Sequence, residues 1–352
     1  MKKIIYKSNS DDLLHPADRR RFYGFISKRN FQISLSDQID KGDIVVLTNG
    51  KNSDLSKYVR NKVSKNYYIV YDCCDAYLAE RKSLRKYFRA IFYFLSGKYK
   101  YFYFSNTKLI KEICKISDAV ICSSKEQKNE ILKYSNNVEI ILDLFDDDIF
   151  SVKKNYDIED ELNIFWEGQG DNIVEFNDFA PILNKLGKKI KIKLHIVSDK
   201  KFKKNFRITF DTNKYLKKIF YNIDISFYMW SVDNLNNIGT KCDIAIIPSS
   251  KKFSKMFINK SPNKLHIMWK LGLPTLTSFS YSYSREMKEA DIDMICRDAS
   301  DWEKKILYFY ENYEDRRVSA LKGLSYVNKK YSDNSKLEKW DKLFNSFGLN
   351  IS

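Results

Sequence analysis

The segment with the clearest chemical meaning runs from residue 261 to 278, SPNKLHIMWKLGLPTLTS. Ser261 is a good N-cap, and Pro262 fits the first position of a helix. Gly272 stands where such a helix would end, and Pro274 stops it before the strand that follows. The segment therefore predicts a short helix between a loop and a strand.

The start of this predicted helix has the composition of an anion site. Free amide groups and the positive end of the helix dipole attract negative charge at a helix N-terminus. Ser261, Asn263 and Lys264 add a hydroxyl, an amide and a cation at the same place. A diphosphate would fit there; the alternative is a capped helix of an α/β fold that binds nothing.

A second candidate for phosphate contact is the segment IFWEGQGDNI, residues 164–173. Its pattern predicts a strand that runs into a turn containing Glu167, Gly168 and Gly170. Small residues in such a turn let the backbone approach a phosphate closely. The alternative is an ordinary turn between a strand and a helix.

Candidate acid–base groups occur in the N-terminal half. His15 and Asp18 follow the first predicted strand and are candidates for a general base, and the adjacent Arg19–Arg21 could meet a phosphate. Asp72 and Asp75 come just after another buried strand. The alternatives are a solvated helix start for the arginines and helix capping for Asp75.

The elements that must position these groups alternate in type. Short apolar runs predict strands buried on both faces, and amphipathic stretches between them predict helices, which together indicate a parallel sheet wrapped by helices. The predicted strands of the first half are KIIYKS, DIVVLTN, YYIVYD, DAVICSS and VEIILD. The pattern restarts after a polar, acidic stretch at 146–161 with LNIFWEG, KLHIVSD, ISFYMW, CDIAIIPSS, PTLTS and DMICRD.

At 352 residues the chain is long enough for two hydrophobic cores. We expect an α/β protein of two doubly wound, Rossmann-like domains, residues 1–155 and 156–330, joined by a linker near 150–160.

Three stretches together are similar to a known enzyme family. The SPNKL…GLP segment with Tyr281 in the following loop, CDIAIIPSS before it, and SDAVICSSKEQKNEIL near the end of the first half resemble GT-B glycosyltransferases, especially the GT4-like group. The resemblance implies two Rossmann-like domains that face each other across a cleft. It also implies a nucleotide-sugar donor on the C-terminal domain, an acceptor on the N-terminal domain, and a last helix, about 331–352 with Trp340, that packs back on the first domain.

The resemblance also assigns residues to the site. The implied contacts to the nucleotide and its sugar are Glu167, Gly168, Gly170, Lys260, Ser261, Pro262, Asn263, Lys264, Tyr281 and Arg285. Lys260, Lys264 and Arg285 are candidates to neutralise the leaving diphosphate, as preorganised cations do in place of a metal. The catalytic candidates are His15, Asp18, Asp72 and Asp75.

The sequence departs from the GT4-like pattern at one place. That pattern has two glutamates eight positions apart, which contact the sugar and ribose of the donor. Here Asn259 stands at the first position and Ile267 at the second. The identity of the donor and a retaining mechanism are therefore open, and transfer of a sugar phosphate or alditol phosphate on the same fold is a second hypothesis.

No metal or other cofactor is expected. The acidic groups Asp146–Asp148 and Asp291-x-Asp293 do not follow a strand in the context that the metal-binding DxD motif of the other glycosyltransferase fold requires. The three histidines are far apart and the six cysteines form no CxxC pair, so a zinc site has little support.

Charge and hydropathy indicate where the protein works. The net charge of +17 favours anionic partners such as nucleotides, acidic lipids or nucleic acid. No signal peptide or membrane span is predicted, so we expect a cytoplasmic protein. The interleaved basic and aromatic residues of 81–104 suit peripheral contact with the inner membrane surface, or alternatively a core-packed helix and strand.

The leading hypothesis is a glycosyltransferase that acts on a glycan or lipid-linked acceptor in bacterial capsule or lipopolysaccharide synthesis. A basic nucleic-acid-binding protein is a distant alternative, because the basic residues are spread along the chain and no nucleic-acid-binding motif is present. We expect no nucleic-acid partner.

Overall fold

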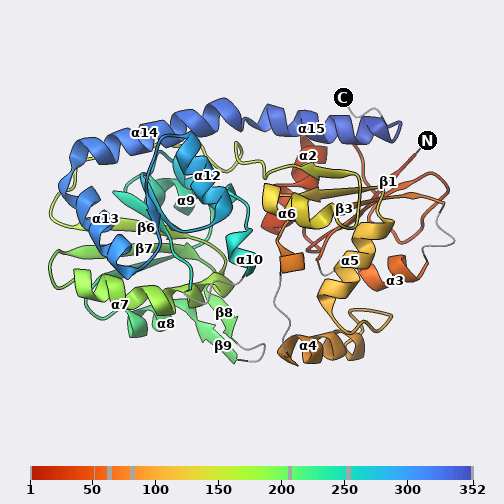
Figure 1. Ribbon diagram of the computed structural model, residues 1–352, viewed down its shortest axis with the longest axis horizontal. Helices are drawn as coiled ribbons and strands as arrows, with labels where there is room; N and C mark the ends of the chain where they lie inside the picture. The colour runs from red at the N-terminus through yellow and green to blue at the C-terminus, as the bar shows by residue number, and fades with distance from the viewer. Residues whose placement is uncertain are drawn as a thin grey trace. The chain divides into compact units, whose positions relative to one another are not determined.

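The computed structural model describes residues 2–50, 52–61, 66–79, 84–204, 208–250 and 255–349. The chain folds into two compact units (Figure 1). Unit 1 comprises residues 1–144, 254–261 and 333–352, and unit 2 comprises residues 145–253 and 262–332. Each unit is an α/β structure with its own core.

Unit 1 is built on a parallel sheet with the strand order β1-β2-β3-β4-β5. The strands are β1 (Ile4–Lys7), β2 (Ile44–Leu47), β3 (Tyr68–Asp72), β4 (Ala119–Cys122) and β5 (Val138–Ile140). The first four are almost entirely buried, as their continuous apolar runs predict for strands covered on both faces.

The helices of unit 1 cover both faces of this sheet. They are α1 (Pro16–Arg19), α2 (Phe22–Lys28), α3 (Leu55–Arg60), α4 (Leu84–Leu95), α5 (Asn106–Ile116), α6 (Lys125–Ile131), α10 (Lys255–Ile258) and α15 (Asp333–Ser346), with a 3₁₀ turn at Tyr77–Ala79. Side chains of α2 and α15 pack on one face, and those of α3, α5 and α6 pack on the other. This arrangement makes the unit doubly wound.

A β-bridge outside the named strands shows how the chain of unit 1 reverses. Ser34 pairs in parallel with Ile5, and its backbone bonds to Ile4 and Tyr6 at 2.8 and 2.9 Å. The chain therefore passes from β1 to a position on one side of it and then crosses to β2 on the other side. Such a reversal is the topological switch of doubly wound sheets.

Unit 2 contains a parallel sheet with the order β10-β7-β6-β11-β12-β13. The strands are β6 (Leu162–Glu167), β7 (Ile192–Ser198), β10 (Asp224–Met229), β11 (Ile244–Ile247), β12 (Thr275–Ser278) and β13 (Ile295–Cys296). Numbered along the unit, this order is 3-2-1-4-5-6, the order of the Rossmann fold.

The remaining elements of unit 2 surround this sheet. They are a 3₁₀ helix at Gly170–Glu175, α7 (Phe176–Leu186), α8 (Thr212–Ile219), α9 (Val232–Gly239), α11 (Asn263–Lys270), α12 (Tyr281–Glu289), α13 (Ala299–Glu311) and α14 (Tyr313–Lys330), with an antiparallel hairpin of β8 (Lys201–Lys204) and β9 (Ile208–Asp211). No helix within the described ranges is both long enough and apolar enough to cross a bilayer.

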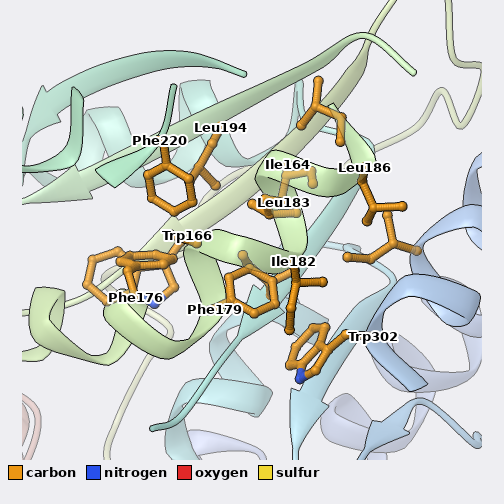
Figure 2. Close-up of a cluster of buried hydrophobic side chains, with 14 of the residues drawn as sticks. Ile164, Trp166, Phe176, Phe179, Ile182, Leu183, Leu186, Leu194, Phe220 and Trp302 are labelled. Carbon is orange, nitrogen blue, oxygen red and sulfur yellow. The ribbon is translucent and has the colours of Figure 1, made fainter. Parts of the chain in front are cut away.

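The core of unit 2 is rich in aromatic side chains. Figure 2 shows Trp166 beside Phe176 and Phe179 beside Trp302. The ring centroids of these two pairs are 5.1 and 4.7 Å apart. They bring β6, α7 and α13 together on one face of the sheet.

The division between the units lies at 144/145 rather than near the expected 155. Residues after Phe145 bond to unit 2: the amides of Phe150 and Ser151 donate to Asn236 Oδ1 at 3.0 and 3.1 Å, and the Lys153 amide donates to Leu271 O at 2.9 Å. These contacts attach the acidic stretch to unit 2 instead of leaving it as a linker. The last helix, α15, belongs to unit 1.

Candidate functional site

The strand order of unit 2 identifies where a ligand would bind. β6 lies between β7 and β11, so the chain reverses its direction across the sheet at the β6/β11 pair. In open α/β sheets, ligands bind beyond the carboxyl ends of the strands at this switch point. The loop of Gly168 after β6 and the loop of Ser249 and Ser250 after β11 both start there.

Gly168 occupies a turn in which its backbone is bonded on both sides. Its amide donates to Val197 O at 3.1 Å, and its carbonyl accepts the Ser198 hydroxyl at 2.6 Å. A Cβ at position 168 would stand 2.6 Å from Lys264 Nζ and 2.9 Å from the Trp166 ring. A larger residue at position 168 would therefore have to displace the Lys264 ammonium and press on the Trp166 ring, so the glycine leaves room for Lys264 beside the backbone.

Lys264 is held at this turn by an aromatic ring. Its ammonium lies 4.7 Å from the centre of the Trp166 ring, within the range of a cation–π interaction. Trp166 is 2% exposed and packs against Phe176 in the core (Figure 2). The ring thus fixes the lysine, which stays half-buried at the carboxyl edge of the sheet.

Helix α11 presents its first turn at the same edge. It begins one residue later than predicted: Pro262 is the N-cap, and Asn263 is the first helical residue. The first backbone bond of the helix runs from His266 N to Pro262 O, so the amides of residues 263–265 precede the helical ladder. Pro262 and Asn263 are buried, whereas Ser261 is half-buried.

The loop after β11 adds polar groups that the sequence interpretation missed. The Ser249 amide donates to Ser278 Oγ at 2.9 Å, which links the ends of β11 and β12. The Ser250 hydroxyl donates to Asp178 Oδ2 at 2.6 Å, and its amide donates to Glu175. The CDIAIIPSS pattern pointed to this loop, but no spacing along the chain connects it to the two carboxylates of the α7 region.

Glu167 and Gly170, the two other predicted residues of this turn, lie in different environments. Glu167 is the last residue of β6 and is 5% exposed. The Gly170 amide donates to Asp199 Oδ2 at 2.7 Å, and a Cβ there would stand 3.0 Å from Phe202 Cβ. Because the Gly170 amide already donates to Asp199, it is less available to donate to a phosphate.

Tyr281 is the first residue of α12, which follows β12, and Arg285 lies about one turn further along the helix. Ser280 caps this helix by accepting the Tyr283 amide at 3.1 Å. Tyr281 is 52% exposed, with its ring 5.5 Å from that of Phe279. Both predicted residues therefore belong to unit 2, together with Glu167, Gly168, Gly170, Pro262, Asn263 and Lys264.

Lys260 and Ser261 belong to unit 1. The Lys260 ammonium lies 5.9 Å from the ring centre of Phe257 on α10. The preceding Asn259 is fixed through its backbone, because its carbonyl accepts the Ser124 hydroxyl at 2.9 Å. A role for Lys260 and Ser261 in donor binding stays a prediction.

The candidate bases of unit 1 have partners that account for their positions. Asp72 is buried against Arg21, with Nε to carboxylate distances of 3.0 and 2.9 Å. Burial raises the pKa of Asp72, against the opposing effect of Arg21. Arg21 also bonds to Asp143 at 3.0 Å, which gives this arginine a structural role instead of a free phosphate-binding one.

Asp18 and His15 act locally at the first turn after β1. Asp18 accepts the amides of Asn9 and Ser10 at 2.8 and 3.0 Å, as well as the hydroxyl of Tyr6. His15 caps α1 by accepting the Ala17 amide at 3.2 Å. These contacts order the loop.

Asp75 accepts the amide of the next residue, Ala76, at 3.2 Å. A catalytic role for His15, Asp18, Asp72 or Asp75 stays a prediction. Among the residues that the structure describes, no group of three or more His, Cys, Asp or Glu side chains is arranged to hold a metal ion.

Comparison with solved structures identifies the fold, whereas comparison of the sequence finds no relative. No protein-family model matches the chain, and no curated protein matches its sequence. HepE from Anabaena, in complex with UDP-glucose, is similar in structure with a TM-score of 0.62 and 9% identity, over 98% of this chain and 100% of HepE. Sucrose-phosphate synthase from Thermosynechococcus elongatus gives a TM-score of 0.62 and 10% identity, over 92% of this chain and 76% of that one.

TarM has a TM-score of 0.56 and 14% identity over 87% of this chain, which spans 56% of the length of TarM. HepE, sucrose-phosphate synthase and TarM are GT-B glycosyltransferases. The likeness confirms the architecture that the sequence resemblance implied. The chain has the GT-B fold, with two Rossmann-like domains.

Proposed function

We propose that the chain is a glycosyltransferase that binds a nucleotide-sugar donor at the carboxyl edge of the unit 2 sheet. The observation that supports this most is the convergence of Lys264 and Gly168 at the switch point, where a Cβ on the glycine would stand 2.6 Å from the lysine ammonium. A cation, a backbone without a side chain and the first turn of α11 meet there. These are the features that a diphosphate requires.

Each of these groups has a definite task in the proposed reaction. The amides of the first turn of α11 and the Lys264 ammonium would stabilise the negative charge that grows on the diphosphate as the glycosidic bond breaks. Trp166 keeps the ammonium in place, so little reorganisation is needed during the reaction. The Ser250 hydroxyl is held in position by its bond to Asp178. It would bond to a hydroxyl group of the sugar or ribose. We propose that no metal takes part.

The acceptor and the biological role belong to the same proposal. We assign a glycan or lipid-linked acceptor to unit 1, and a role in the synthesis of bacterial capsule or lipopolysaccharide. The support is the resemblance of the sequence to the GT4-like group. A base for the acceptor hydroxyl would come from His15, Asp18, Asp72 or Asp75.

One observation favours a second class of donor, which contains a sugar phosphate or alditol phosphate. Ile267, which stands where the GT4-like pattern has its second glutamate, is 2% exposed and lies in the core. Position 267 therefore supplies no carboxylate that could contact a donor sugar. A donor with a sugar phosphate or alditol phosphate in place of the sugar is compatible with this change.

The test of the proposal is nucleotide binding by Lys264→Met. We expect the parent protein to be stabilised against heat by one class among UDP-, GDP-, CMP- and CDP-linked compounds. The variant should bind the same compound roughly tenfold or more weakly, because one charge-assisted contact to phosphate is lost. Titration followed by thermal shift and calorimetry measures the difference.

Lys288→Met is the matched control, because it removes an exposed lysine from α12 in the same unit. Its affinity should equal that of the parent protein. Equal affinity in Lys264→Met, or no stabilisation of the parent by any nucleotide, contradicts the proposed site. A response to CDP-linked polyol phosphates alone would select the second substrate class.

A further inference from the structure

A cluster of exposed aromatic and aliphatic side chains lies on unit 1, in the connection between β3 and α5. Here it is called the aromatic patch. Its members are Tyr87 (39% exposed), Phe88 (65%), Phe92 (61%), Phe94 (42%), Leu95 (76%), Phe102 (37%) and Phe104 (62%). Exposed apolar residues are ordinary when they are scattered, but a concentration of this kind marks an interaction surface.

Helix α4 contributes one continuous apolar face to the patch. Phe88, Phe92 and Leu95 follow the i, i+4, i+7 spacing that places side chains on one side of a helix. Among the described side chains of α4, only that of Ala90 is buried. In Figure 1, α4 lies at one end of unit 1, beyond α5. The helix therefore turns its apolar face away from the core that it would otherwise help to build.

The segment after α4 extends the patch. The ring of Phe102 lies 5.7 Å from that of Phe94 and 5.2 Å from that of Phe104. Phe104 in turn lies 6.3 Å from Tyr87 on the helix. The two segments thus form a single aromatic surface.

The stretch of chain that forms the patch carries basic residues and no acidic ones. Residues 84–111 contain no aspartate or glutamate, and their basic residues are Arg85, Lys86, Arg89, Lys98, Lys100, Lys108 and Lys111. Two of these cations lie over exposed or partly exposed rings: Lys98 Nζ is 4.3 Å from the Tyr93 ring centre, and Lys100 Nζ is 6.0 Å from that of Tyr101. Residues 81–83, at the start of the basic and aromatic stretch 81–104, lie outside the described residues.

We infer that the aromatic patch binds the surface of a bilayer that contains anionic lipids. An amphipathic helix with aromatic side chains on one face and cations around it lies in the plane of the membrane interface. The cations gain from the negative surface potential, while the rings enter the headgroup region. A second copy of this chain is a poor occupant, because it would bring an equally basic surface against the first.

Vesicle binding by a triple variant tests this inference. In Phe88→Ser, Phe92→Ser and Leu95→Ser combined, every cation is kept while the apolar face of α4 is removed. We expect the parent protein to sediment with phosphatidylcholine vesicles that contain about 30% phosphatidylglycerol, and only weakly with pure phosphatidylcholine. The partition coefficient of the triple variant should fall at least about tenfold.

The matched control removes three equally exposed apolar side chains from unit 2: Ile208→Ser, Tyr221→Ser and Met229→Ser, which are 57%, 73% and 53% exposed. It should bind vesicles as the parent does. Binding of the parent should also persist in part at about 0.5 M NaCl, where purely electrostatic attraction is screened.

Several results would overturn the inference. One is equal vesicle binding by the triple variant and the parent, since the net charge alone would then explain it. Another is a lack of binding by the parent to either vesicle. A third is a parent dimer in sedimentation velocity that the triple variant converts to a monomer without any vesicle binding, which would assign the patch to a second copy. Circular dichroism melting confirms that each variant is folded.

Discussion

At the scale of single residues, Glu286 joins three helices of unit 2. Its carboxylate on α12 accepts bonds from His266 Nε2 on α11 at 3.2 Å and from the hydroxyl of Tyr326 on α14 at 2.9 Å. The hydroxyl of Tyr331, just after α14, donates to it at 3.0 Å. Burial by itself raises the pKa of Glu286, but the hydrogen bonds and charge of these partners outweigh it, so the pKa is lowered.

Glu286→Gln should therefore destabilise the protein in a pH-dependent way. Because the pKa is lower in the folded protein than the 4.5 of the free side chain, the ionised carboxylate stabilises the fold above pH 4.5. This contribution is lost as the pH falls through the lowered pKa. At neutral pH we expect a loss of about 1–3 kcal/mol in the free energy of unfolding.

Urea unfolding of parent and variant at neutral pH and at about pH 3.5 measures the effect. The difference between them should shrink in acid. Glu314→Gln, which removes an exposed partner of Arg317, is the matched control and should change little at either pH. A difference for Glu286→Gln that does not depend on pH would show that the carboxylate charge is not what stabilises this junction.

At the scale of elements, α11 and α14 approach each other closely at one glycine. A Cβ on Gly323 of α14 would lie 2.6 Å from the ring of Trp269 on α11. Trp269 is completely buried. The glycine is needed here for space and not for an unusual backbone angle, because it lies inside a regular helix.

Gly323→Ala should destabilise the protein even though alanine favours a helix. The gain in helix propensity is about 1 kcal/mol, whereas the overlap with a buried indole costs about 1–3 kcal/mol or more once the helices separate. We expect a net loss of stability and, because α11 moves, weaker nucleotide binding. Ser325→Ala, an exposed position on the same helix, is the matched control and should be neutral or slightly stabilising.

Urea unfolding and the nucleotide titration provide both readouts for these two variants. Unchanged stability in Gly323→Ala would mean that the indole can move aside freely. Loss of stability without any loss of nucleotide affinity would separate the packing of α11 from its proposed role in binding.

At the scale of the whole molecule, the two units have separate cores with separate tryptophans. Trp340 of α15 is fully buried in unit 1, with its ring 5.5 Å from Phe25 of α2. Trp302 of α13 is 4% exposed in unit 2, with its ring 4.7 Å from Phe179 of α7. Each indole thus reports on the unit that surrounds it.

Trp340→Ala and Trp302→Ala form a matched pair that should act on different units. Each should cost its own unit about 3–5 kcal/mol, because a large side chain leaves a cavity. Hydrogen exchange followed by mass spectrometry should show faster exchange in β1–β5 for the first variant and in β6, β7 and β10–β13 for the second. Faster exchange throughout the chain in either variant would contradict independent units.

The amino-acid sequence by itself determined the features that depend on near neighbours. Alternating apolar and amphipathic stretches predicted the α/β class and two Rossmann-like domains, which the fold confirms. Gly272 and Pro274 predicted the end of α11; Gly272 has a φ of +73°, as a residue just after a helix end requires, and β12 starts at Thr275. Caps and periodicity act over a few residues, so a single chain segment contains all the information needed.

Only the tertiary structure decided which side chains meet. The ring of Trp166 under Lys264, the bond from Ser250 to Asp178 and the bond from the Gly170 amide to Asp199 all join segments that are distant along the chain. The attachment of residues 145–156 to unit 2 has the same origin. Such contacts depend on the order of strands in the sheet and on the packing of helices across it. Both are determined by the burial of apolar surface over the whole domain, and local sequence patterns do not contain that information.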